Sequence, residues 1–180
     1  MLAKAVEDEK ERRKTVALNL IIEAVGDGAK EGVHFGNEDA EQFADMLLRF
    51  MAAARDGAAK QNLRLMARLI VGLKRDSTFE ADQFQRWATI LKDMTALEIE
   101  IVAECYRVLK KGGVIDRPWA EVMEALSTNH DRNDIRQSAA ALMRTGLLVP
   151  ESLMSGISYE PTSSVLQLGE LAELDSAAST

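Results

Sequence analysis

The sequence of 180 residues contains one cysteine, Cys105, so it cannot form a disulfide bond within the chain. It contains only three prolines, and 5% of its residues are aromatic, whereas 47% are hydrophobic. The scarcity of proline and the many Ala, Leu, Met, Glu and Arg residues favour a mainly α-helical fold. The two most apolar runs, Val16–Val25 and Leu63–Leu73, are short and contain charged residues, which predicts no membrane span.

We also expect no secretory signal, because the chain becomes acidic at Glu7-Asp-Glu9, where a signal peptide is apolar. We therefore expect a cytoplasmic location. The formal net charge is −7, which disfavours indiscriminate binding to nucleic-acid phosphates or anionic lipid. Residues 1–94 carry 15 basic and 16 acidic side chains, and residues 95–180 carry 7 and 13. The acidic character of the C-terminal half counts against DNA binding by that half.

Helical spacing of apolar residues predicts an N-terminal helical bundle over residues 1–94. Its first helix is expected at Ala3–Val25 and to end at Gly26-Asp-Gly28. One face of this helix is an apolar stripe that we predict as an oligomer interface, formed by Val16, Leu20, Ile21 and Val25. We interpret Gly26–Gly36 as a connector between helices, because a phosphate-binding loop would follow a strand and here a helix precedes it.

Three more helices are predicted in this bundle. The first starts at Asn37 as N-cap and ends near Arg55-Asp-Gly57, and the second covers Ala58–Arg75. The third is expected to begin with the capping box Ser77-Thr-Phe-Glu80 and to end near Lys92. Asp93-Met94 is too short for a flexible linker, so the two halves should form one body or two docked domains.

Residues 95–175 are predicted to form a second domain, followed by a frayed tail at residues 176–180. Its first helix begins with a second capping box, Thr95-Ala-Leu-Glu98. The expected elements are three helices, two strands and a final helix, with the bounds Thr95–Lys111, Arg117–Ser127, Arg132–Thr145, Leu147–Val149 and Ile157–Glu160 before the final helix. The fold class predicted for the whole chain is therefore mainly α with a small β-hairpin.

Three segments of this C-terminal half resemble winged helix-turn-helix proteins: Ala140-Ala-Leu-Met-Arg-Thr-Gly-Leu-Leu-Val149, Tyr159-Glu-Pro-Thr162 and Leu168-Gly-Glu-Leu171. The chain departs from that pattern, because the spacing from Thr162 to Gly169 is about one turn longer and the hairpin tip, Pro150–Gly156, is not basic. The resemblance implies a winged-helix-like domain in which Arg132–Thr145 is the recognition helix.

If this domain binds DNA, the resemblance implies base contacts from Arg132, Asn133, Arg136 and Gln137 and a phosphate contact from Arg144. The alternative is a winged helix that docks onto proteins. A second resemblance involves Phe84-Gln-Arg-Trp-Ala-Thr-Ile-Leu-Lys-Asp-Met-Thr-Ala-Leu-Glu98, which is similar to the helical stretch before the C-terminal domain of abortive-infection proteins. That similarity implies a link to phage defence and no particular chemistry.

Basic residues are concentrated elsewhere, in residues 49–75. Lys60, Arg64 and Arg68 are spaced four apart and share one face of a predicted helix. This stripe would bind the phosphates of nucleic acid or of lipid headgroups, or it is a solvated face paired with acidic side chains.

No catalytic, metal or cofactor site is predicted. His34 and His130 lack Cys or carboxylate partners at ligand spacing, and Cys105 lies on an apolar helical stripe typical of a core residue. Trp87 and Trp119 are expected to anchor the core. The leading hypothesis is a non-enzymatic helical protein that acts through protein contacts, as a homo-oligomer or with another protein. The alternative is a nucleic-acid-binding winged-helix regulator.

Overall fold

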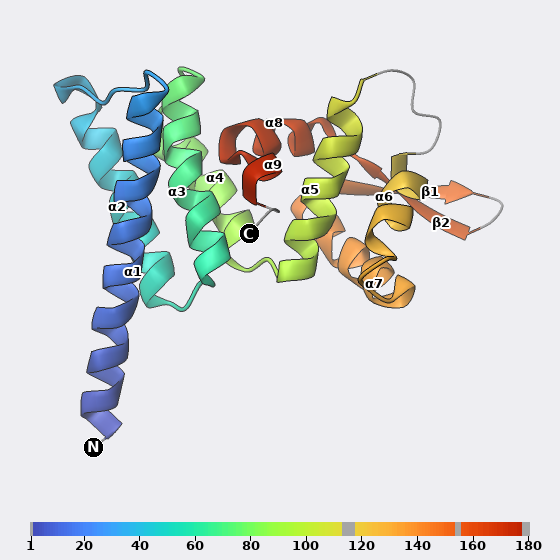
Figure 1. Cartoon of the computed structure of the whole chain (residues 1–180), viewed down its shortest axis with the longest axis horizontal. Helices are drawn as coiled ribbons and strands as arrows, with labels where there is room; N and C mark the ends of the chain where they lie inside the picture. The colour runs from blue at the N-terminus through green and yellow to red at the C-terminus, as the bar shows by residue number, and fades with distance from the viewer. Residues whose placement is uncertain (1, 113–117, 154–155, 178–180) are drawn as a thin grey trace. The chain divides into compact units, whose positions relative to one another are not determined.

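The computed structural model describes residues 2–112, 118–153 and 156–177 of the chain. It confirms a mainly α-helical fold with one small antiparallel β-hairpin near the C-terminus (Figure 1). The chain divides into two compact units. Unit 1 comprises residues 1–93 with residues 171–173, and unit 2 comprises residues 94–170 with residues 174–180. The prediction from the sequence had placed residues 171–173 in the C-terminal domain.

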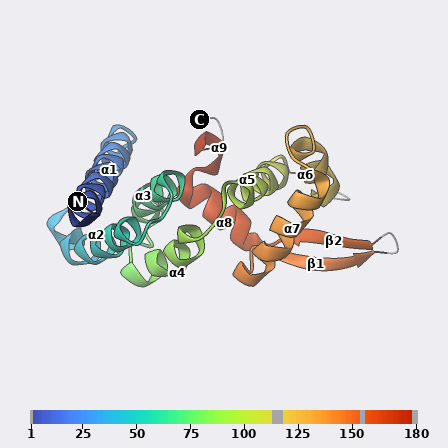
Figure 2. The same cartoon turned by 90° about the horizontal axis from the view of Figure 1, so that it is seen from below.

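Unit 1 is built from four α-helices, which are α1 (Leu2–Lys30), α2 (Ala40–Arg55), α3 (Lys60–Arg75) and α4 (Ala81–Lys92). α3 packs against all three of the others (Figure 2). Ten of its sixteen residues are buried, including Leu65, Ile70 and Val71, which lie on different sides of the helix. A helix that is apolar on most sides belongs in the centre of a domain, because it has no face to give to water.

α1 is longer than predicted, because Gly26 and Gly28 do not end it and the helix continues to Lys30. Gly28 is instead a packing residue. A Cβ atom at this position would lie 2.5 Å from Cγ1 of Val71, so the missing side chain allows α1 to approach α3 closely. At the other end, α1 extends beyond the ends of its neighbours (Figure 1), and residues 3–8 are exposed.

The start of α2 also differs from the prediction, since Asn37 is not its N-cap. Residues Asn37–Asp39 form one 3₁₀ turn, and the backbone N–H of Gly36 donates a hydrogen bond of 2.8 Å to the Asp39 carboxylate. The Lys74 ammonium lies 2.7 Å from the same carboxylate. These two donors hold the pKa of Asp39 below its usual value, and Lys74 has the larger effect. A partly buried ion pair therefore links the start of α2 to the end of α3.

The loop before that turn is anchored by aromatic packing. The ring of Phe35 contacts those of Phe43 and Phe79, with centroids 5.1 and 5.3 Å away. The predicted capping box at Ser77 is wrong, because Glu80 is the N-cap of α4 and makes no side-chain cap hydrogen bond among the described residues. The side-chain carbonyl of Gln42, on α2, instead accepts a hydrogen bond of 2.8 Å from the backbone N–H of Ala81 at the start of α4. Ser77 has a φ of 58° and instead makes the turn after α3. The ends of α3 at Arg75 and of α4 at Lys92 agree with prediction, whereas α3 begins at Lys60 rather than at Ala58.

Unit 2 has the predicted order of elements. They are α5 (Ala96–Lys110), α6 (Pro118–Leu126), α7 (Arg132–Leu142) with a 3₁₀ turn at Met143–Thr145, β1 (Leu148–Leu153), β2 (Gly156–Pro161), α8 (Ser163–Ala172) and α9 (Leu174–Ala177). α5 packs against α6, α7 and α9. Ala172 is buried, and the last two α8 residues, with Glu173, belong to unit 1. α9 covers the start of the predicted frayed tail, whose residues 178–180 lie outside the described residues.

Side chains cap two helices of unit 2. The hydroxyl of Thr95 accepts a hydrogen bond from the backbone N–H of Glu98, and the Glu98 carboxylate accepts one of 2.7 Å from the Thr95 N–H. This confirms the predicted capping box. The carboxylate of Asp131 accepts a hydrogen bond of 2.7 Å from the backbone N–H of Asn133 at the start of α7. Both helix starts are therefore set by local sequence.

The hairpin is longer than predicted, because Pro150–Leu153 belong to β1 rather than to the tip, and the tip residues 154–155 lie outside the described residues. Pro150 pairs with Tyr159. The Tyr159 ring packs edge-on against Trp119 of α6, with centroids 4.9 Å apart, so one face of the hairpin joins the core of unit 2. Thr162 closes its base by donating to the carbonyl of Gly146 at 2.8 Å.

None of the described helices combines the length and the apolar character needed to cross a bilayer.

Candidate functional site

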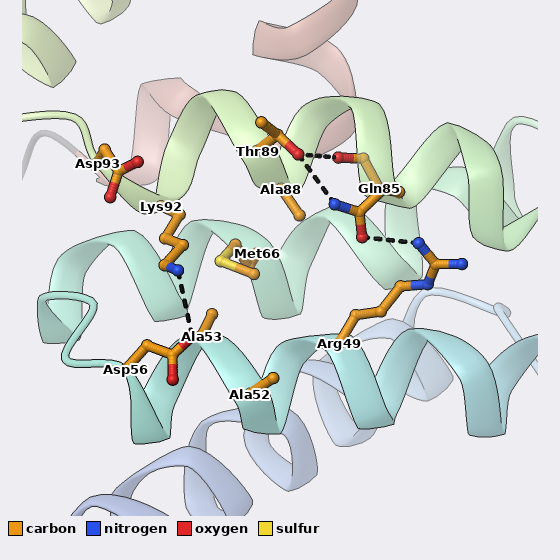
Figure 3. A pocket seen from close by; sticks show the side chains of 10 residues that line it. All are labelled: Arg49, Ala52, Ala53, Asp56, Met66, Gln85, Ala88, Thr89, Lys92 and Asp93. Carbon is orange, nitrogen blue, oxygen red and sulfur yellow. Dashed lines mark hydrogen bonds and ion pairs between the residues drawn. The ribbon is translucent and has the colours of Figure 1, made fainter.

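A cleft opens between α2 and α4 of unit 1, with a volume of about 290 Å³ (Figure 3). Arg49 donates a hydrogen bond of 2.7 Å to the side-chain carbonyl of Gln85, and the Lys92 ammonium lies 3.3 Å from the Asp56 carboxylate. Both contacts join residues 36 positions apart, so the two helices run parallel and in register. The walls between these bridges are small side chains, including Ala53, which leaves the cleft open.

The charges of this α2/α4 cleft balance. Arg49 and Lys92 are matched by the carboxylates of Asp56 and Asp93. Lys92, by a hydrogen bond, and more weakly Arg55 lower the pKa of Asp56. Because its side chains satisfy one another, the α2/α4 cleft has no excess charge with which to select an ionic ligand.

A second cavity, of about 210 Å³, lies where α1 passes the start of α3. We call it the cationic cavity, because three basic side chains and one carboxylate line it: Arg12, Arg13, Lys60 and Glu9. Glu9 accepts hydrogen bonds of 2.7 and 2.8 Å from Arg12 and one of 2.8 Å from Arg13. These hydrogen bonds lower the pKa of Glu9 to about 2, and those from Arg12 have the largest effect. Glu9 is therefore ionised at neutral pH.

The loop from α2 to α3 shapes this cavity. Gly57 has a φ of 100°, and a Cβ atom there would lie 2.9 Å from Nη1 of Arg13. Glycine thus makes the turn and leaves room for the guanidinium. α3 begins at the cavity with no acidic residue in its first turn. Sequence reasoning missed this site, because residues 7–14 have the pattern of a solvated charge run and only the fold brings them to Gly57.

The structure separates the residues of the predicted oligomer stripe. Leu20 and Ile21 are buried inside unit 1, Val16 lines the cationic cavity, and Val25 is half-buried. A second, largely apolar stripe of α1, which shares Val25 with the predicted one, lies on the solvent side of the helix. We call it the outer stripe, and its members are Thr15, Leu18, Ile22, Val25 and Ala29. Their spacing of three and four residues was the signal in the sequence that could have revealed it.

The predicted basic stripe on α3 is not one exposed face. Lys60 is exposed, whereas Arg64 and Arg68 are half-buried. The Nε atom of Arg64 is buried and has no hydrogen-bond partner among the described residues. Arg68 donates to the backbone carbonyl of Glu173 at 3.5 Å. A phosphate backbone therefore does not meet three free cations along this helix.

The predicted nucleic-acid contacts on α7 do share an exposed surface. Arg132, Asn133, Arg136 and Gln137 are all exposed. Arg132 donates to the hydroxyl of Ser127 at 3.2 Å, near the start of the helix. Arg144, in the following turn, instead lies 3.6 Å from the buried carboxylate of Glu98.

The hairpin beside α7 offers little to a polyanion. Residues 147–162 contain Glu151 and Glu160 and no basic residue. Val149 and Ile157, on its strands, are exposed apolar side chains. The surface around α7 is therefore mixed in charge rather than cationic.

The titratable side chains singled out earlier do not converge. Cys105 is fully buried, and burial raises the pKa of its thiol to about 12, so the nucleophilic thiolate is suppressed. His130 lies 2.7 Å from the Glu100 carboxylate, and His34 is exposed in unit 1. Within the described residues no group of three His, Cys, Asp or Glu side chains is placed to hold a metal ion. Trp87 and Trp119 are buried, as predicted.

Comparison with known proteins gave no match: no protein-family model, no curated protein and no solved structure matches this chain. The surfaces and cavities described above are therefore the basis for assigning a function.

Proposed function

We propose that this protein is non-catalytic and acts through protein–protein contacts, the first of which is its own association through the outer stripe of α1. The observation that carries this proposal is the exposure of Ile22 and Leu18 on that stripe, 67% and 38%. Large aliphatic side chains in register on a long helix lose contact with water when a second apolar stripe covers them.

The occupant that the outer stripe fits is a second copy of α1. Its residues follow the alternating three- and four-residue spacing that lets the side chains of one helix insert between those of another. A two-fold pair of identical helices presents the same spacing from both sides, so the stripe is complementary to itself. The inner side of α1, which includes Leu20 and Ile21, is already used within unit 1.

The test is the mass of the protein in solution, measured by light scattering after size-exclusion chromatography over a range of concentrations. We expect the wild-type chain to be a dimer, and Ile22→Glu to weaken dimerisation at least about tenfold, because a carboxylate would be buried in an apolar contact. Removing the N-terminal residues would be a poorer test, because Leu20 and Ile21 belong to the core.

The matched control is Leu48→Glu, since Leu48 is 69% exposed and lies on α2 of the same unit. This variant should remain a dimer. A wild-type chain that stays monomeric at every concentration contradicts the proposal, as does an Ile22→Glu variant that dimerises as well as Leu48→Glu.

Nucleic-acid binding by unit 2 is the second candidate function. It is supported by the exposed polar surface of α7, on which Arg136 makes no ion pair with any described residue, and by a three-helix and hairpin order consistent with a winged helix. Fluorescence anisotropy with duplex DNA at about 50 mM salt tests it, since electrostatic association is strongest at low salt. Binding that Arg132→Gln and Arg136→Gln reduce supports it, whereas no binding removes it.

A further inference from the structure

We propose that the cationic cavity of unit 1 binds a phosphate-type dianion. Three cationic side chains reach it from two elements, Arg12 and Arg13 from α1 and Lys60 from α3. The only carboxylate among its described lining residues is Glu9. The local charge is therefore about two positive units, which a phosphate or a phosphate monoester would neutralise.

The hydrogen-bond donors of the cavity are only partly used. The Glu9 carboxylate accepts hydrogen bonds from Nε and Nη2 of Arg12 and from Nε of Arg13. The terminal Nη atoms of Arg13, of which Nη1 lies beside Gly57, and the ammonium of Lys60 have no acceptor among the described residues. A guanidinium edge and an ammonium offer several N–H donors in the arrangement that phosphate oxygens accept.

Charge distinguishes this cavity from the α2/α4 cleft. In that cleft the cation Lys92 already pairs with Asp56, and Arg49 pairs with the neutral Gln85. A second carboxylate, Asp93, lies at the Lys92 end, so the lining residues carry no net charge (Figure 3). In the cationic cavity, Glu9 shares its single charge between two arginines and leaves Lys60 unpaired within the described chain. A volume of about 210 Å³ admits a phosphate group together with a small organic substituent.

The experiment is isothermal titration of inorganic phosphate into the full-length protein at low ionic strength, with chloride as the reference anion. We expect saturable binding of one phosphate per chain. Lys60→Gln and Arg13→Gln should each weaken it roughly three- to tenfold, as expected when one partly exposed charge is removed. Arg49→Gln, in the α2/α4 cleft, is the matched control and should leave the affinity unchanged.

Glu9→Gln gives a result that a damaged fold cannot imitate. Removing the resident carboxylate leaves three cations unopposed, so phosphate affinity should rise roughly threefold or more. Circular dichroism of each variant verifies the helical fold. The proposal is overturned by the absence of saturable binding to the wild type, by equal affinities in all variants, or by a Glu9→Gln variant whose affinity does not rise.

Competition identifies the source of the phosphate. Phenyl phosphate and a short oligothymidylate are titrated against protein already loaded with inorganic phosphate. Displacement by phenyl phosphate alone assigns the site to small phosphate monoesters. Displacement by the oligonucleotide contradicts a site for a dianion, because each backbone phosphodiester carries one negative charge, and it assigns the cavity to a nucleic-acid backbone. Displacement by neither compound assigns it to free phosphate, provided that the variants respond as stated.

Discussion

Each of the two units surrounds a buried central helix, α3 in unit 1 and α5 in unit 2, but the helix starts are defined differently. In unit 2, side chains of Thr95 and Asp131 cap α5 and α7. In the described part of unit 1, no N-cap side chain bonds to the starts of α2, α3 or α4. Helix starts in unit 2 are therefore encoded in adjacent residues, whereas those in unit 1 depend on contacts between distant residues.

The units also differ in charge, and this affects what each can bind. Residues 1–94 are nearly neutral overall, yet three of their basic side chains line the cationic cavity, and the apolar side chains of Leu18 and Ile22 are exposed on α1. Residues 95–180 carry an excess of acidic side chains, and their hairpin lacks a basic residue. The proposed anion site therefore depends on the local charge of the cationic cavity and not on the average charge of the unit.

The largest expected effect is on the two central helices. Leu69 of α3 and Ile101 of α5 are both fully buried. Replacing either with alanine should lower the free energy of unfolding by about 2–5 kcal/mol, through lost apolar burial and the remaining cavity. Chemical denaturation measures both. A loss below about 1 kcal/mol for Leu69→Ala would mean that α3 is not the centre of unit 1.

Substitutions of two glycines in α1 test whether close packing against α3 requires glycine at position 28. Gly28→Ala should destabilise the protein by about 1–3 kcal/mol, because the new methyl group would overlap Val71. Gly26→Ala should instead stabilise it by about 0.5–1 kcal/mol, since nothing lies within 4 Å of a Cβ there and alanine favours a helix. Thermal denaturation measures the stability of both variants. Equal changes in stability would contradict the close approach of α1 and α3.

The two predicted capping boxes, at Thr95 and at Ser77, give a smaller difference in stability between the units. Thr95→Ala should cost about 1 kcal/mol, because the start of α5 loses its cap. Ser77→Ala should change stability by less than about 0.5 kcal/mol through capping, because Ser77 is not the N-cap of α4. Urea titrations of both variants measure the difference. If Ser77→Ala cost as much as Thr95→Ala, the contrast in capping would be lost.

The smallest expected effect is a pH dependence in unit 1. Lys74 and the Gly36 N–H lower the pKa of Asp39, so its carboxylate stabilises the fold above the unfolded-state value of about 4. This contribution is lost as the pH falls through the lower, folded-state pKa. Asp39→Asn should therefore be less stable than wild type at neutral pH, and the difference should narrow below about pH 4. Denaturation at several pH values measures this, and a constant difference would contradict it.

Much of the fold could be predicted because its signals are local. The inward residues of α4, such as Phe84 and Trp87, repeat at helical spacing, and Thr95 and Glu98 form a complete capping box within four residues. The predicted starts of α2 and α4 were wrong. Before α2, Asp39 is held by an ion pair with Lys74, and before α4, Ser77 forms the turn that follows α3. These contacts join residues that the sequence alone cannot pair.

The sequence by itself determined the helical class, the order of elements in the C-terminal half and the hairpin, since each depends on residues close together in the chain. Only the tertiary structure decided that Gly28 continues α1, that Leu20 is core while Ile22 is exposed, and that Arg13 meets Gly57. Periodicity shows that a helix has apolar faces, but which of them is buried depends on the neighbours that fold against it.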